Sequence, residues 1–423
     1  MFMQLEILSI GDELLIGQVV NTNATFISKE FDCIGIATRR IVTIGDDRRV
    51  IQQELERALS AADIVAITGG LGPTHDDVTK DALAEFFGLE YEFNEDAYQN
   101  CRNIFEQRGL RMPEISRSQA LVFKGCVVLQ NSCGTAPGMI LHSLPNYDGK
   151  YIVIMPGVPS EMQEMMRRSV IPYFAPLSKT YIKHTHLMTS GAGESHLAEL
   201  IGDEKAFLTP GSTLAYLPQT SSVNLRVTTR GTNCEQVERE NAAIVAIISA
   251  RIQKYLYATD EQSLEAFLGA LLKQRGLTIA TAESCTGGLI AHRLTNVPGS
   301  SHYFIESYVV YNNLAKEHTL GVRRETLEKF GAVSQEVALE MAKGCLQRSG
   351  ADIALATTGI AGPTGGTETK PVGMLCLALA TTSKLGNQEK AKTLYFTKDR
   401  LHNKELFAQA ALDWLRQTLV SAD

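Results

Sequence analysis

The stretch Ile64-Val65-Ala66-Ile67-Thr68-Gly69-Gly70-Leu71-Gly72-Pro73-Thr74-His75-Asp76-Asp77-Val78-Thr79 decides the fold of the first part of this chain. Its first four residues are rich in β-branched side chains, which is typical of a buried parallel strand. A glycine-rich turn follows, and the chain then continues into a helix that is expected to reach Phe87 and to end at Gly88. A strand that runs through a polar turn into a helix predicts an α/β sheet with a ligand at the strand end.

Upstream of this stretch, strand-like and helix-like segments alternate. Residues 5–10 and 36–44 are predicted strands, and residues 22–31 and 50–62 are predicted helices. This βαβαβ order predicts a doubly wound sheet, in which ligands bind at the carboxyl ends of the strands.

Glycine-rich or polar turns follow several of the predicted strands. Residues 11–15 follow the first strand, and residues 131–138 and 155–161 follow two later strand-like segments. Glycine lets the backbone approach a ligand closely, and the start of a helix offers free N–H groups to a phosphate. We therefore expect one ligand pocket, with the candidate residues Gly11, Asp12, Gly69, Gly70, Gly72, Thr74, Asn131, Gly134 and Gly157.

The neighbouring carboxylates Asp76 and Asp77 are candidate metal ligands. Paired carboxylates bind hard cations, so they are expected to hold magnesium or a similar divalent ion against a diphosphate. The alternative is that one of them only caps the following helix. A cap needs a single Asp, so the second one, together with the glycines and threonines of the turn, favours a ligand site.

Residues 177–258 have a different pattern. Residues 197–201 and 241–255 are helix-like, whereas residues 214–217 and 223–228 alternate between apolar and polar side chains. This alternation predicts half-exposed strands. The segment is therefore expected to form a small α+β module that serves as a connector or a dimerisation element.

The turn Thr281-Ala282-Glu283-Ser284-Cys285-Thr286-Gly287-Gly288 carries the chemistry of the last part of the chain. A predicted strand, residues 277–280, precedes it, and a predicted helix, residues 289–294, follows it. The turn would hold a hydroxyl beside the unpaired N–H groups of a helix start, which supplies a nucleophile and donors for an oxyanion. The alternating strands and helices that follow predict a second α/β sandwich.

A serine nucleophile at Ser284 needs a base. Lys316, which follows Tyr311 by five residues, is a candidate because a desolvated lysine can lose its proton and act as a base. The alternative is that Lys316 is solvated on an amphipathic helix, as an arbitrary lysine is. Cys285 is a rival nucleophile, since a thiolate at a helix start is activated. Three nearby histidines are more typical of surface positions than of a base: His292, His302 and His318.

These motifs together resemble the competence/damage-inducible CinA family. Residues 69–79 carry the resemblance in the first part of the chain, which in this family is similar to the molybdopterin-binding domains of molybdenum cofactor synthesis. Residues 281–288, 311–316 and 359–366 carry it in the last part, which is similar to the stand-alone nicotinamide mononucleotide deamidases.

The resemblance implies three parts: a molybdopterin-binding-like nucleotide and metal domain at 1–175, an α+β connector at 176–258 and an α/β/α amidohydrolase domain at 259–423. It implies hydrolysis of nicotinamide mononucleotide to nicotinate mononucleotide and ammonia without a cofactor. For the first domain it implies a nucleotide or pterin ligand and, in some members, a metal-dependent ADP-ribose pyrophosphatase. The alternative is a non-catalytic nucleotide- or molybdopterin-binding protein related to competence. A homodimer is expected.

The same resemblance assigns roles to residues. Ser284 is the implied nucleophile, Lys316 its base and Tyr311 an orienting or relaying group. Two positions depart from the family pattern: Ser307 stands where glycine is expected and would narrow the pocket, and Asn312 stands where serine is expected and would alter a hydrogen bond near Lys316. The implied substrate-binding residues are Thr286, Gly287, Gly288, Gly359, Gly362, Gly365 and Gly366.

Composition excludes several classes of protein. The net charge of −7 is spread over interspersed acidic and basic residues, which argues against a nucleic-acid partner. The apolar runs are shorter than the roughly 20 residues that a membrane span needs. The start of the chain lacks the features of a signal peptide, and the eight cysteines form no zinc-type cluster. We expect a soluble, cytoplasmic protein with reduced cysteines.

Overall fold

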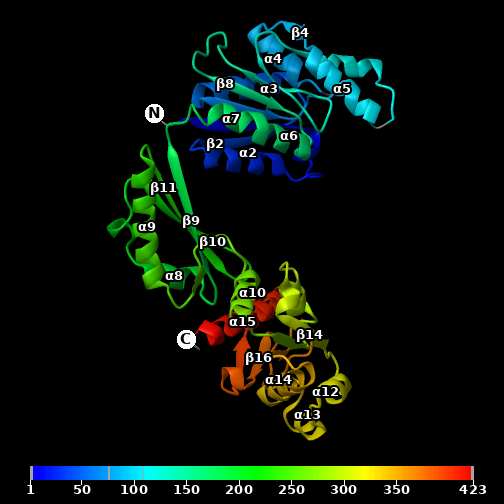
Figure 1. The fold of residues 1–423 in the computed structure, drawn as a ribbon, viewed down its shortest axis with the longest axis vertical. Coiled ribbons are helices and arrows are strands. Elements are labelled where there is room, and N and C mark those ends of the chain that lie inside the picture. The colour runs from blue at the N-terminus through cyan, green and yellow to red at the C-terminus, as the bar shows by residue number, and fades with distance from the viewer. Residues whose placement is uncertain (1–2, 75–76, 108, 421–423) are drawn as a thin grey trace. The chain divides into compact units, whose positions relative to one another are not determined.

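The structure, a computed structural model, describes residues 3–74, 77–107 and 109–420 (Figure 1). By its internal contacts the chain divides into two compact units: Met1–Lys183 with Thr229–Arg239, and His184–Thr228 with Glu240–Asp423. The predicted boundaries after residues 175 and 258 remain predictions. Among the described helices, none combines the length and apolar character that crossing a membrane requires.

The N-terminal sheet has six strands in the order β2-β1-β3-β8-β7-β6. The first four are parallel to one another, and β7 is antiparallel to both of its neighbours. Because β6 therefore runs parallel to β8, their carboxyl ends lie at the same edge as those of β1 and β3. The strands are β1 (Gln4–Ile10), β2 (Ala37–Ile44), β3 (Ile64–Thr68), β6 (Val127–Leu129), β7 (Gly138–Leu141) and β8 (Tyr151–Met155).

Helices cover both faces of this sheet, as the doubly wound prediction requires (Figure 1). Alternate residues of a strand enter different cores: Leu8 packs with residues of α3 and α4, whereas Ile7 packs with residues of α2 and α6. The helices are α1 (Asp12–Leu15), α2 (Thr22–Cys33), α3 (Arg48–Ala61), α4 (Thr79–Phe87), α6 (Pro159–Met165), the π-helical turn η2 (Met166–Val170) and α7 (Ile171–Phe174). Gly88 ends α4 in the left-handed conformation, as predicted.

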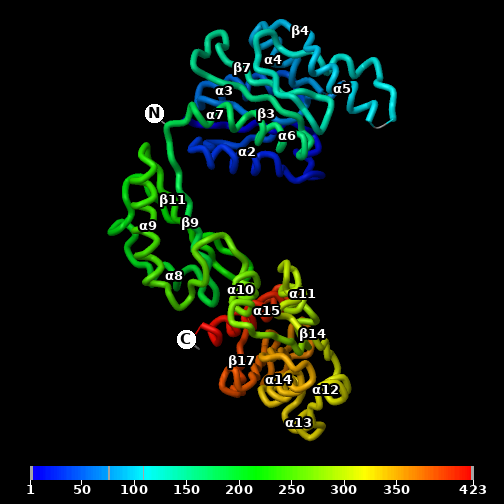
Figure 2. The backbone as a smooth tube through the Cα atoms, viewed as in Figure 1, coloured from blue at the N-terminus to red at the C-terminus, as the bar shows by residue number. Residues whose placement is uncertain are grey.

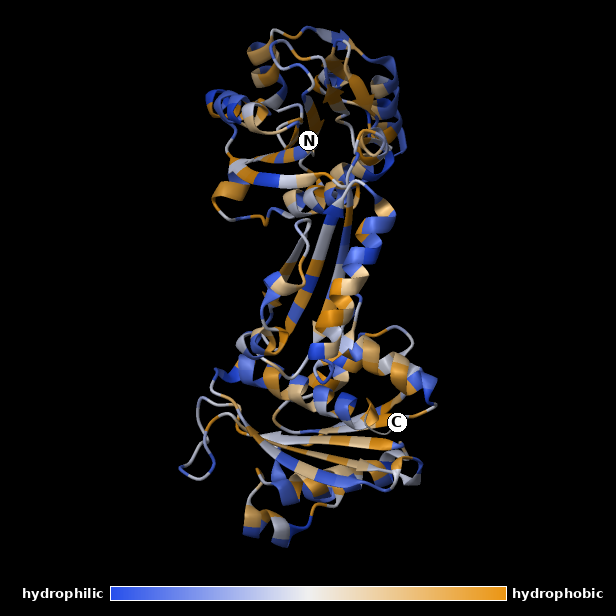
Figure 3. Ribbon diagram, turned by 90° about the vertical axis from the view of Figure 1, so that its left-hand side faces the viewer, coloured by the Kyte–Doolittle hydropathy of each residue, from blue (hydrophilic) through white to orange (hydrophobic). Residues whose placement is uncertain are grey.

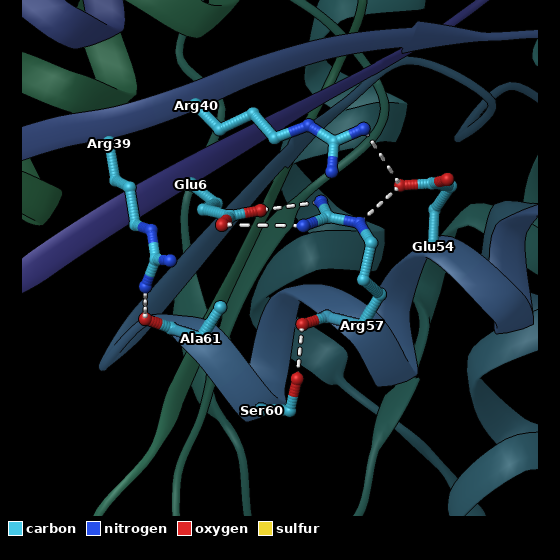
Figure 4. A network of polar contacts seen from close by, with 7 residues as sticks. All are labelled: Glu6, Arg39, Arg40, Glu54, Arg57, Ser60 and Ala61. Carbon is cyan, nitrogen blue, oxygen red and sulfur yellow. Dashed lines mark hydrogen bonds and ion pairs between the residues drawn. The ribbon is translucent and has the colours of Figure 1, made fainter.

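A buried ion pair fixes α3 against the sheet. Glu6 on β1 is only 1% exposed, and Arg57 of α3 approaches it with an Nη2–Oε2 distance of 2.5 Å (Figure 4). Arg57 also contacts Glu54 one turn earlier, at 2.8 Å. A buried carboxylate is tolerated when its charge is paired in this way, so the contact stabilises one register of α3 on β1.

An insertion that the sequence pattern did not predict follows α4. It contains β4 (Tyr91–Phe93), α5 (Glu95–Gln107), the 3₁₀-helix η1 (Glu114–Ala120) and β5 (Leu121–Phe123), which pairs antiparallel with β4. The two strands have three residues each, too few to show a periodic pattern.

The middle module is a four-stranded sheet in the order β10-β11-β9-β12, which the chain enters from α7 (Figure 2). The apolar and polar alternation of its long strands is visible in Figure 3. The prediction of half-exposed strands is wrong for β11, because polar Asn224 and Thr228 are buried in the interior of the sheet. The elements are β9 (Tyr181–Thr189), α8 (Glu194–Ile201), η3 (Glu204–Ala206), β10 (Ser212–Pro218), β11 (Val223–Gly231), α9 (Cys234–Arg251) and β12 (Leu256–Ala258).

The C-terminal sheet has the order β14-β13-β15-β16-β17, with β13 parallel to both neighbours and the last two strands antiparallel. One core packs α10, α11 and α15 on one face, and a second packs α12, α13 and α14 on the other, which confirms the predicted sandwich. The strands are β13 (Ile279–Glu283), β14 (Phe304–Val309), β15 (Ile353–Gly359), β16 (Met374–Thr381) and β17 (Glu389–Tyr395). The helices are α10 (Leu264–Gln274), α11 (Leu289–Thr295), η4 (Ser300–His302), α12 (Asn313–Leu320), α13 (Arg324–Phe330), α14 (Gln335–Ser349), η5 (Ser383–Leu385) and α15 (Arg400–Val420).

Candidate active site and N-terminal ligand pocket

Ser284 lies at the carboxyl end of the central strand β13. The strand extends further than predicted, because Thr281 to Glu283 pair with β14 on one side and with β15 on the other. The turn therefore begins at Ser284, whose backbone N–H donates to the carbonyl of Thr357 on β15 at 3.0 Å. Ser284 is 7% exposed, so its hydroxyl is held in place at the strand end.

Lys316 reaches this hydroxyl from α12. Its Nζ lies 3.1 Å from Ser284 Oγ, 3.0 Å from the carbonyl oxygen of Val310 and 3.3 Å from that of Tyr311. The side chain is 1% exposed, and this burial lowers the pKa of Lys316 from its ordinary value. Asn312 caps α12 by accepting from the N–H of Ala315 at 2.7 Å, so this departure from the family pattern fixes the helix that carries Lys316.

Glu283 is a site residue that sequence reasoning missed. Its buried carboxylate accepts the backbone N–H groups of Gly288, Ile290 and Ala291 at 3.0, 3.1 and 2.8 Å. An acidic residue directly before a turn that starts a helix is the signal that could have revealed it. The free N–H groups at the start of α11 are thus occupied by the protein's own carboxylate.

The predicted oxyanion donors are the N–H groups around Thr286, Gly287 and Gly288, and this arrangement removes the last two. The N–H of Gly288 is bound to Glu283, and that of Gly287 donates to the carbonyl of Ser284 at 3.2 Å. Among the described residues, the N–H groups of Cys285 and Thr286 donate to no other residue, although that of Cys285 lies near its own thiol. These two groups follow the serine directly and are the donors left for a developing oxyanion.

A cavity of about 260 Å³ opens in front of Ser284 and Lys316. Three of the predicted substrate-binding glycines line it: Gly359, Gly362 and Gly365. The other four predicted residues are absent from its lining, since Thr286 is buried against Thr357, Gly366 packs against Val372, and Gly287 and Gly288 lie in the turn that Glu283 closes.

Arg400, at the start of α15, also lines this cavity and was not predicted. Its guanidinium donates to the carbonyl of Gly362 at 2.7 Å and to the hydroxyl of Tyr311 at 2.8 Å. Tyr311 is 60% exposed, and its contact with Lys316 is made by its backbone carbonyl. The hydroxyl of Tyr311 thus binds Arg400 rather than the serine–lysine pair, which corrects its predicted role as a proton relay.

Of the remaining candidates around the turn, Cys285 lines the cavity beside Ser284, whereas the others are absent from the described lining. Ser307 accepts a hydrogen bond from Thr281 at 2.7 Å within the sheet and is absent from the cavity lining, so it does not narrow the pocket. Burial raises the pKa of the Cys285 thiol to about 12, which disfavours the thiolate that a cysteine nucleophile needs. Like Ser307, the three histidines are absent from the described lining: His292, His302 and His318.

The N-terminal unit holds a second cavity, of about 470 Å³, at the carboxyl ends of its strands. Of the predicted ligand residues, six line it: Gly11, Gly69, Gly70, Gly72, Asp77 and Gly157. Asp12, Thr74, Asn131 and Gly134 support the surrounding loops instead, and Asp76 lies outside the described residues. The lining also contains Glu13, Asp46 and Glu161, which sequence reasoning missed.

The Asp77 carboxylate forms hydrogen bonds within the glycine-rich loop to which Asp77 belongs. Its carboxylate accepts from the N–H of Gly72 at 2.7 Å and from the N–H and hydroxyl of Thr74 at 3.0 and 2.5 Å. It does not cap α4, whose first turn follows Val78 without a side-chain cap. Within the described part of the chain, no group of three His, Cys, Asp or Glu side chains is placed to hold a metal ion. Because Asp76 lies outside the described residues, the cation site at Asp76 and Asp77 stays a prediction.

The glycines of this loop have a structural cause as well. Gly69 has φ of 111°, and a Cβ atom there would lie 2.0 Å from the carbonyl oxygen of Ile10. At Gly134 a Cβ atom would lie 2.1 Å from the carboxyl carbon of Glu161, which Asn131 binds at 2.7 Å. The backbone contact thus requires glycine at Gly69 whether or not a ligand approaches, whereas the contact at Gly134 is with the end of a side chain.

Models of known protein families match all three parts of the chain. Residues 6–176 match a probable molybdopterin binding domain, residues 184–258 the damage-inducible protein CinA KH domain and residues 261–419 the CinA C-terminal domain. A CinA-like protein of Chloroherpeton thalassium is 62% identical over 98% of this chain and 99% of its own length. One of Chlorobium phaeobacteroides is 50% identical over 97% and 98%.

Among solved structures, a competence/damage inducible protein, CihA, from Agrobacterium tumefaciens is 40% identical. The match covers 37% of this chain and 96% of that chain, with a TM-score of 0.35. The near full-length similarity to the two bacterial relatives shows that the chain belongs to the CinA family.

Proposed function

We propose that the C-terminal domain hydrolyses the carboxamide of nicotinamide mononucleotide to nicotinate mononucleotide and ammonia. One observation carries this proposal: the buried amine of Lys316 lies 3.1 Å from the hydroxyl of Ser284 at the mouth of a cavity. A serine beside a desolvated lysine is an activated nucleophile of the kind that acyl transfer requires.

The surroundings of Lys316 favour its neutral form as the base. A neutral amine has two N–H donors and one lone pair, and the carbonyls of Val310 and Tyr311 are placed to accept those two donors. The lone pair is then left to accept the proton of Ser284.

In this mechanism Ser284 Oγ attacks the carboxamide carbon as its proton passes to Lys316. The N–H groups of Cys285 and Thr286 stabilise the oxyanion. Collapse of the tetrahedral intermediate breaks the C–N bond, and the Lys316 ammonium returns the proton to the leaving group, which departs as ammonia. Water, deprotonated by Lys316, then hydrolyses the acyl-enzyme and frees Ser284.

We assign the nucleotide phosphate to Arg400 and the glycine-rich loop of the cavity. Arg400 and the loop from Gly359 to Gly365 line the cavity, and a guanidinium can bind a phosphate in a bidentate manner. The exposed ring of Tyr311, held by Arg400, is positioned to contact the substrate.

The experiment that tests this function is ammonia release by the full chain with nicotinamide mononucleotide. We expect turnover with the mononucleotide and far less with free nicotinamide, which lacks the phosphate that Arg400 would bind. A folded wild-type preparation that releases no ammonia from the mononucleotide would contradict the proposal and favour a non-catalytic binding protein.

The pH dependence of this reaction follows from the position of Lys316. Burial lowers the pKa of Lys316 from its ordinary 10.5, and only the neutral amine acts as a base. We therefore expect kcat/KM to rise with pH through a pKa below 10.5 and then to level off. The Cys285→Ala variant should show the same rise of kcat/KM with pH. If the rise disappears in that variant, it reports the titration of the thiol and not of Lys316.

For the N-terminal cavity we propose a nucleotide- or pterin-type ligand, on the strength of its position at the strand ends and its glycine-rich walls. A metal-dependent ADP-ribose pyrophosphatase is the second candidate. This activity needs a bound cation, and among the described residues no group of three His, Cys, Asp or Glu side chains is placed to hold one. AMP formation from ADP-ribose that depends on added Mg²⁺ and is lost in Asp76→Asn would support it, and binding without turnover would exclude it.

A further inference from the structure

Gln119 is a buried amide without a partner. It lies on the 3₁₀-helix η1, is 1% exposed and lines the N-terminal cavity. Neither its Oε1 nor its Nε2 has a hydrogen-bond partner among the described residues. A buried amide that makes no hydrogen bond destabilises a protein, so a side chain kept in this state calls for a partner that arrives from elsewhere.

The rest of the cavity lining restricts what that partner can be. It contains four carboxylates, Glu13, Asp46, Asp77 and Glu161, and no Lys, Arg or His among its described residues. Burial raises the pKa of Asp46, and the neighbouring carboxylates act in the same direction. A bare anion beside these groups would be repelled, so the part of the ligand that enters here is neutral or rich in N–H donors.

Apolar side chains complete the wall. Ile10, Leu71, Pro156 and Val158 line the same cavity, and they offer a flat ring a non-polar surface. The combination of an apolar wall, acceptor carboxylates and one free carboxamide suits a heteroaromatic ring that carries a donor next to an acceptor.

We propose that Gln119 recognises the hydrogen-bonding edge of a heteroaromatic ring in the N-terminal ligand. This inference rests on the proposal that the cavity binds a nucleotide or a pterin. The carboxamide of Gln119 accepts from a ring N–H or amino group and donates to an adjacent ring nitrogen or carbonyl. Adenine and pterin both present such an edge, and they differ in how many donors lie side by side.

The test is calorimetric titration of the full-length protein with ADP-ribose and, separately, with neopterin. Gln119→Leu keeps the size of the side chain and removes both polar atoms, so the ligand that binds the wild type should bind about tenfold more weakly or worse. Gln99→Leu on the neighbouring helix α5 is the matched control and should leave the affinity unchanged. Because the amide of Gln119 has no partner without ligand, Gln119→Leu should not lower the Tm of the free protein.

The Gln119→Glu variant distinguishes the hydrogen-bonding edge of adenine from that of a pterin. A carboxylate only accepts, so it loses the contact with an adenine edge, which pairs one donor with one acceptor. With a pterin it exchanges the donated hydrogen bond for a second accepted one, because the ring N–H and the amino group are adjacent donors. Weaker ADP-ribose binding or retained neopterin binding in this variant therefore supports the proposal and names the ring.

Two results would overturn the inference, and they can be told apart. If the wild type binds a probe and Gln119→Leu binds it equally well, Gln119 has no role in recognition. The proposed ligand class of the cavity is then retained. If the wild type binds neither probe, the proposed ligand class of the pocket fails, and the role of Gln119 fails with it.

Discussion

Replacing Lys316 with methionine is expected to lower ammonia release from nicotinamide mononucleotide by about 10³-fold or more, the range that a general base contributes to catalysis. Methionine has a similar length and no proton-accepting nitrogen, so Ser284 would lose the only amine within hydrogen-bond distance among its described contacts. The loss should appear in kcat, because Lys316 acts on the reacting proton rather than on the phosphate end of the substrate.

The control for this variant is Lys343→Met, which removes an exposed lysine of the same domain that pairs with Glu389. It should retain full turnover. Lys316→Arg should be as inactive as the methionine variant, because arginine stays protonated and cannot accept the serine proton. If Lys316→Met keeps more than a tenth of the wild-type kcat and is folded by circular dichroism, Lys316 is not the base.

Replacing Glu283 with alanine is expected to lower the free energy of unfolding of the C-terminal domain by about 3 kcal/mol, because it leaves buried N–H groups without their acceptor. Glu283 is fully buried and accepts the N–H groups of Gly288, Ile290 and Ala291. The same change frees the turn that follows Ser284, so ammonia release should fall together with stability.

Glu328→Ala is the matched control, since it removes an exposed glutamate that pairs with Arg324 and should change stability by less than about 0.5 kcal/mol. Glu283→Gln should lie between the two, because an amide keeps one acceptor oxygen and places an NH₂ group toward a backbone N–H. Urea unfolding of the three variants measures their free energies of unfolding and so tests this order. Equal stability of Glu283→Ala and the wild type would contradict the role of Glu283 as the anchor of α11.

The sequence pattern predicted the sheets better than the sites. Local apolar runs located β1, β3 and the start of β13 because buried strands need them. The pairing of Ser284 with Lys316, 32 residues apart, followed from the family resemblance and not from local pattern. Arg400 reaches the same cavity from α15, and no local feature of its surroundings marks it as a site residue.

Charged and polar side chains could not be assigned because their roles depend on tertiary contacts. Asp77 has the appearance of a metal ligand in sequence, yet its oxygens hold Gly72 and Thr74. Gln119 lies in an insertion that the periodicity did not predict, and its unpaired amide is visible only when the fold is known. The sequence pattern places Glu283 in a turn, whereas in the structure it ends a strand and binds the next helix.

The most direct test of the serine–lysine site compares ammonia release from nicotinamide mononucleotide by Ser284→Ala and Cys285→Ala. The hydroxyl of Ser284 contacts Lys316, whereas burial holds the pKa of the Cys285 thiol at about 12. We predict that Ser284→Ala loses turnover by about 10³-fold or more and that Cys285→Ala remains within about tenfold of the wild type. Full turnover in Ser284→Ala with loss in Cys285→Ala would contradict the proposed mechanism.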